Sequence, residues 1–169
     1  MSFDLNVEFD SLPDDLKTRW AATFRSEGFE VEICPGFDPA SWEGGFLPMR
    51  VTVAPETLVG VSLPAAAIGG FEVSFDEPDA FDGGNKRCAH FRFGWGGPSL
   101  EFAMLCIGAA LLAQLTNGTY VDPQSGEEHD RDACLAAAKT SVREFLHQQR
   151  AVSLEVHSFS SWEDLGVQV

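Results

Sequence analysis

The sequence predicts a single α+β domain over residues 1–169, with a mainly antiparallel or mixed sheet of about six strands and three main helices. Several short segments alternate apolar and polar residues, and three longer ones repeat apolar residues at helical spacing. A chain of 169 residues with 44 % hydrophobic content is long enough to bury one core. The order of the segments is compatible with a ferredoxin-like arrangement elaborated by extra strands.

The chain opens with a predicted strand, helix and strand. Apolar and polar residues alternate over 3–9, which is typical of a half-buried strand. Ser11 and the Pro-Asp-Asp at 13–15 provide a capping hydroxyl, a first-turn proline and carboxylates at the start of a helix over 12–27. A strand over 29–33 follows. We therefore expect a β-α-β opening or a split version of it.

The middle of the chain is predicted to be a run of strands. Residues 35–46 have the composition of a loop, 47–53 alternate as a strand, and 55–70 form a partly helical connection. The strands over 71–76 and 89–95 carry opposite charges on their polar faces. They therefore suit an antiparallel ribbon, in which each cross-strand pair adds roughly 0.2–1 kcal/mol.

The last third alternates helices and strands. A strongly apolar helix is expected over 100–116, a short strand over 119–121, and a long helix over 130–148. A final strand near 152–156 precedes a tail that docks on the core through Trp162 and Leu165. We expect the three main helices to pack mostly on one face of the sheet.

Charge is the most unusual feature of the composition. The chain has 26 acidic and 11 basic residues, a formal net charge of −15. Such a field repels nucleic acid and anionic lipid and attracts basic proteins. The 14 Phe and 4 Trp argue against a disordered acidic tail. The composition therefore indicates a folded acidic protein with no nucleic-acid or membrane partner.

The sequence also bears on location. It starts without the basic region and apolar run of a secretory signal, and its longest apolar stretch, 102–113, is too short to span a bilayer. The four cysteines are scattered without a CxxC pair, as expected of reduced thiols. We expect a cytoplasmic protein.

Two acidic segments are candidates for a metal site. The carboxylates and His129 over 127–132 are consecutive in sequence at an expected helix start, where capping and the helix dipole explain them. The loop over 76–82 lacks the ligand spacing of a calcium-binding EF-hand. The sequence predicts no metal and no cofactor.

Cys88 and His90 form the candidate catalytic pair. They lie two residues apart on a predicted strand, but cysteine–histidine dyads are assembled by the fold rather than by this spacing. The glycine runs match no phosphate-binding loop. We predict no catalytic residue. The alternative is an enzyme or small-molecule-binding domain with a pocket between sheet and helices, using His90, Arg92 and Cys88.

A partner-binding surface is predicted where aromatic residues lie among carboxylates. Aromatic anchors provide binding energy and charges steer the encounter with a basic protein. Phe37 and Trp162 are further aromatics expected to be exposed, the alternative being that such rings fold back over the edge of the core. The predicted binding residues are Trp42, Asp76, Glu77, Asp79, Phe81 and Asp82. The sequence thus predicts a non-enzymatic binding or inhibitor protein that occludes a basic partner, such as a toxin or nuclease domain.

The segment from Ala109 to Gly126, AALLAQLTNGTYVDPQSG, carries a resemblance. It is similar to an element of small uncharacterised bacterial α+β proteins, some of which resemble toxin-immunity proteins. In these a buried helix ends at glycine, a short strand follows, and an Asp-Pro-Gln turn leads to a helix. The resemblance implies a cytoplasmic bacterial α+β domain and an immunity-like function, without assigning a role to any residue.

Overall fold

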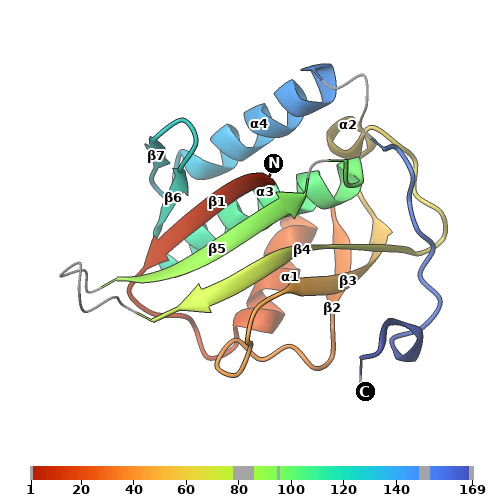
Figure 1. Cartoon of the computed structure of the whole chain (residues 1–169), viewed down its shortest axis with the longest axis horizontal. Helices are drawn as coiled ribbons and strands as arrows, with labels where there is room; N and C mark the ends of the chain where they lie inside the picture. The colour runs from red at the N-terminus through yellow and green to blue at the C-terminus, as the bar shows by residue number, and fades with distance from the viewer. Residues whose placement is uncertain (1, 78–85, 95, 149–152, 168–169) are drawn as a thin grey trace.

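The computed structural model describes residues 2–77, 86–94, 96–148 and 153–167. It contains a seven-stranded antiparallel sheet with the order β2-β3-β4-β5-β1-β6-β7 (Figure 1). The strands are β1 (Ser2–Phe9), β2 (Glu30–Ile33), β3 (Phe46–Val53), β4 (Ala67–Asp76), β5 (Arg87–Gly94), β6 (Thr119–Asp122) and β7 (Glu127–His129). The helices are α1 (Leu16–Ser26), α2 (Glu56–Val59), α3 (Ser99–Thr116), α4 (Cys134–Gln148) and the 3-10 helix η1 (Glu163–Leu165). The predicted α+β class is confirmed.

Two split β-α-β units organise the sheet. Because each neighbouring pair is antiparallel, β1 and β2 run in the same direction and are joined through α1. By the same reasoning β5 and β6 are parallel, lie on either side of β1, and are joined through α3. This agrees with the expected split opening and with an elaborated ferredoxin-like arrangement, extended by the meander from β2 to β5 and by β7.

All the α-helices lie on one face of the sheet. Helix α3 packs directly on β4, β1 and β5, and it also contacts α1, α2 and α4 (Figure 1). Its side chains from Ser99 to Ala113 are buried apart from Glu101. By length and composition α3 could cross a membrane, and 78 % of that window is buried inside this fold.

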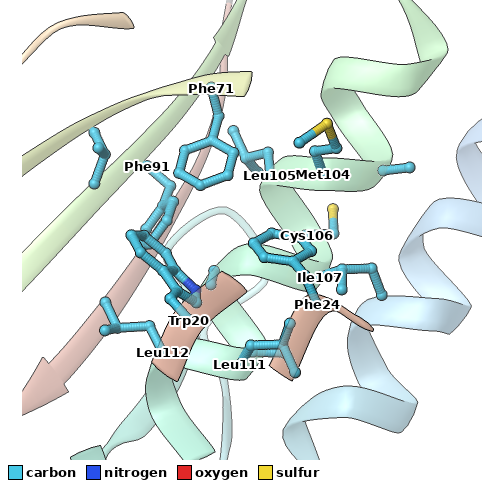
Figure 2. Packing of buried hydrophobic residues seen from close by; sticks show 14 of the residues in the cluster. Trp20, Phe24, Phe71, Phe91, Met104, Leu105, Cys106, Ile107, Leu111 and Leu112 are labelled. Carbon is cyan, nitrogen blue, oxygen red and sulfur yellow. The ribbon is translucent and has the colours of Figure 1, made fainter. Parts of the chain in front are cut away.

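Aromatic rings fill the space between sheet and helices. Trp20 of α1 lies against Phe71 of β4 and Phe91 of β5, with ring centroids 5.6 and 6.2 Å apart (Figure 2). Toward α4, the rings of Phe102 and Phe145 stack with centroids 3.7 Å apart. The inward residues of the strands complete this core, which leaves their outward residues on the opposite face.

The acidic cluster over 127–132 was predicted to lie at the start of a helix, but its first three residues form a strand and the helix begins later. Glu127–His129 forms β7, which pairs with β6 after a turn at 122–126. The Oδ1 atom of Asp130 accepts hydrogen bonds from the backbone nitrogens of Asp132 and Ala133, and α4 begins at Cys134. The hairpin was missed because its backbone pairing requires no apolar alternation.

The predicted strand near 152–156 is also wrong for its described part, since residues 153–156 form no strand. Instead, two isolated bridges hold this part of the chain: Ser153 pairs with Pro98, and Ser158 pairs with Ala67 at the start of β4, beyond the point where β5 has ended. Hydrogen bonds between Ile68 and His157 and between Phe159 and Ala66 hold this tail in place. Of the two residues predicted to dock the tail, Trp162 packs on the core and is 9 % exposed, whereas Leu165 is 36 % exposed.

Candidate functional site

The face of the sheet opposite the helices is the candidate site, and we call it the open face. Alternation in β1, β5 and β4 turns their apolar side chains toward α3 and their polar side chains outward. The antiparallel register aligns the outward residues in three rows. The rows are Asp4–Arg92–Glu72, Asn6–His90–Ser74 and Glu8–Cys88–Asp76.

The two arginines of β5 and the preceding Lys86 each form an ion pair with a carboxylate, Arg92 and Lys86 on the open face and Arg87 on the helix side. The Nε of Arg92 lies 3.0 Å from Asp4 Oδ1, and the side chain of Arg87 lies 2.8 Å from Glu77. Lys86 lies 3.8 Å from Glu8 in the same way. Burial alone would raise the pKa of Asp4, but hydrogen bonds from Arg92 and Ser2 and nearby positive charge lower it.

A hollow of about 520 Å³ opens on this face. Glu43 and Glu72 line it, are exposed, and form no ion pair within the described residues. The hollow also contains Asp4 and Arg92, and Arg92 attracts Glu72 in addition to its ion pair with Asp4. Asp4, Glu43 and Glu72 therefore share one guanidinium, and the net charge of the lining is negative. Its remaining polar lining comes from Asn6, Ser74 and His90.

Trp42 fixes the loop that carries Glu43. Its Nε1 donates a 2.9 Å hydrogen bond to the backbone carbonyl of Val73. The backbone nitrogen of Val73 in turn donates a hydrogen bond to the carbonyl of Gly45. Gly44 and Gly45 have φ of 96° and 111°, a region that favours glycine. The half-buried ring of Trp42 packs edge-on against Phe37 with centroids 5.4 Å apart. Trp42 therefore positions Glu43 and presents only part of its ring to a partner.

The other predicted binding residues are distributed unevenly. Asp76 and Glu77 are exposed at the end of β4, where Asp76 Oδ2 lies 3.0 Å from His90 Nε2. Asp79, Phe81 and Asp82 lie outside the described residues. For Phe37 and Trp162 the alternative interpretation holds, because both rings fold back over the edge of the core and are 4 % and 9 % exposed.

Cys88 and His90 are close together, as their spacing suggested. The Cys88 Sγ lies 3.9 Å from His90 Nδ1, but Asn6 Oδ1 is nearer to that nitrogen, at 2.9 Å. Burial, together with the charges of Glu8 and Asp76, raises the pKa of Cys88 to about 11. The thiol is therefore protonated at neutral pH, whereas an activated nucleophile requires the thiolate.

The sequence did not single out Glu43, Glu72, Asp4 or Asn6. The alternation over 3–9 placed Asp4 and Asn6 on a polar face, which is the signal that could have found them. Asp4 and Asn6 lie beside outward residues of β5 and near those of β4 because of the register between these strands. The alternation within 3–9 does not specify that register. Within the described residues, no group of three or more His, Cys, Asp or Glu side chains is placed to hold a metal ion.

The fold and this surface define an α+β protein whose antiparallel sheet is covered by helices on one face and exposes an acidic face on the other. Comparison with models of known families, with curated proteins and with solved structures found no match for the chain.

Proposed function

We propose that the protein is a non-enzymatic binding protein, of the immunity or inhibitor type, that holds a basic protein partner against its open face. The observation that carries this proposal is the charge balance of that face. Its cations Arg92 and Lys86 already form ion pairs with Asp4 and Glu8, whereas Glu43 and Glu72 line a hollow and form no ion pair of their own within the described residues, although Arg92 attracts Glu72 from a greater distance. A cationic side chain of the partner would form ion pairs with these two carboxylates.

The net charge of −15 supports a two-stage encounter. At long range the negative field raises the association rate of a basic protein and lowers that of anionic competitors. At short range the broad sheet face covers the partner and blocks access to its functional surface. Neither stage requires a chemical step.

The test is affinity capture from the native host at low and high salt, followed by mass spectrometry. The informative variant is Glu43→Lys with Glu72→Lys, and the matched control is Glu56→Lys with Glu144→Lys. The control residues are exposed on α2 and α4, and both variants change the net charge equally. We expect a basic partner that is released at high salt, lost by the first variant and retained by the control. Failure to capture a basic protein, or equal loss in both variants, would overturn the proposal.

A further inference from the structure

A second hollow adjoins the acidic one and is mainly apolar. It has a volume of about 480 Å³, and its walls include Trp42, Phe46 and Pro48. Leu165 and Val167 of the C-terminal tail close another side. Phe46 is 40 % exposed and Leu165 36 %, so large apolar side chains meet water at this rim.

The two hollows share a border across the β3–β4 ladder. Phe46 of the apolar hollow and Glu72 of the acidic hollow are directly opposite in the register. Their Cβ atoms are therefore roughly 4.5–5.5 Å apart on the same face. On the loop side, Trp42 lines the apolar hollow and the adjoining Glu43 lines the acidic one. The hollows therefore form one groove with an acidic half and an apolar half.

We infer that this groove takes an extended segment of the basic partner in which an Arg or Lys lies two residues from a large apolar side chain. The inference rests on the proposed function and specifies which side chains of the partner enter the groove. Charge complementarity assigns the cation to Glu43 and Glu72, and burial of the exposed Phe46 assigns the apolar side chain to the other half. Alternate side chains of an extended chain lie on one side at about 6.5 Å spacing, which suits neighbouring hollows.

The test uses the full chain and fluorescein-labelled peptides at low ionic strength, with fluorescence anisotropy as the readout. The probe is Gly-Gly-Arg-Gly-Leu-Gly-Gly, compared with peptides in which glycine replaces the arginine or the leucine. We expect the peptide that contains both arginine and leucine to bind about tenfold more tightly than the peptide with arginine alone or the peptide with leucine alone. The variant Phe46→Ser should remove the contribution of leucine, whereas Glu72→Gln should weaken both arginine peptides.

Two matched controls separate local from general effects. Val53→Ser removes another exposed apolar side chain of β3, and Glu56→Gln removes a carboxylate outside the groove. Neither should change any affinity, and unfolding curves of all variants check that they fold. Three results would overturn the inference. The peptide with both arginine and leucine does not bind measurably, or it binds no more tightly than the peptide with arginine alone, or the gain in affinity from leucine is unchanged in Phe46→Ser. If the arginine peptides bind equally and Glu72→Gln weakens both, the proposed function still stands. If Glu72→Gln weakens neither arginine peptide, the proposed function falls as well.

Discussion

The indole Nε1 of Trp20 donates a buried hydrogen bond of 3.0 Å to the backbone carbonyl of Gly108, joining α1 to the middle of α3. The missing side chain of Gly108 permits this close packing. A Cβ at that position would lie 2.8 Å from a ring carbon of Phe71 and 3.2 Å from one of Phe24. Gly108 therefore sets how closely α3 approaches both the sheet and α1.

The variant Gly108→Ala tests this packing. We expect it to destabilise the protein by up to about 2 kcal/mol, because overpacking of the aromatic core by the added methyl group costs about 1–3 kcal/mol. Alanine favours a helix by about 1 kcal/mol over glycine, which offsets only part of that cost. Urea unfolding followed by tryptophan fluorescence measures the difference. Gly94→Ala is the control, since a Cβ there meets nothing within 4 Å. Increased stability of Gly108→Ala would contradict the packing argument.

Neutralising the carboxylates of the segment 76–82 tests the steering role that the sequence predicts for it. The variant combines four substitutions: Asp76→Asn, Glu77→Gln, Asp79→Asn and Asp82→Asn. We expect slower association with the captured basic partner and a weaker dependence on salt, because long-range attraction acts mainly on the association rate. Stopped-flow or surface-binding kinetics at two salt concentrations measure both. Binding kinetics identical to those of the unmodified protein would exclude this segment from the encounter.

The reactivity of Cys88 should depend on its buried, negatively charged surroundings. Because burial and the carboxylates of Glu8 and Asp76 raise its pKa to about 11, alkylation by iodoacetamide should be slow at pH 7. The rate should rise about tenfold per pH unit up to that pKa. Glu8→Gln with Asp76→Asn should lower the pKa and speed alkylation at pH 8. Peptide mapping locates the label, and Cys88→Ser is the control; fast labelling of Cys88 at pH 7 would contradict the expectation.

The stability of the protein should respond to Glu101, which lies in the first turn of α3. Burial raises the pKa of this carboxyl, and the charge of His157 opposes the shift only in part. The folded protein therefore binds the proton more tightly than the unfolded chain, so ionisation of Glu101 lowers stability at neutral pH. Glu101→Gln should raise the urea midpoint at pH 7 and lose this advantage as the pH falls through the folded pKa. An unchanged midpoint at pH 7 would count against this interpretation.

Asp4 should behave in the opposite way and provides the contrast. Its pKa is lowered, with hydrogen bonds from Arg92 and Ser2 outweighing burial. Its stabilising effect is therefore present above the unfolded-state pKa and lost as the pH falls through the lower folded pKa. Asp4→Asn should lower the urea midpoint at pH 7, and this difference should disappear in acid strong enough to protonate Asp4 in the folded protein. A loss of the same size at both pH values would show that the ionised carboxylate is not responsible.

The local elements were largely predictable because their periodicities follow from which side chains are buried. Alternation over 3–9 predicted β1, and the apolar run over 100–116 predicted α3. Elements stabilised mainly by backbone pairing were not predictable in this way. The polar strand β7 was missed, and the described part of the strand expected near 152–156 forms only an isolated bridge at Ser153.

The sequence by itself determined the α+β class, the acidic charge and which residues of each strand point away from the core, because alternation and composition are local properties. Only the tertiary structure decided which of those residues meet. Asp4 faces Arg92 and Phe46 faces Glu72 through register, and Trp42 positions Glu43 through a hydrogen bond to β4. These pairings join distant parts of the chain, and a shift of one residue would turn the outward side chains inward. The net negative charge follows from the composition, whereas the fold decides which carboxylates form ion pairs and which do not.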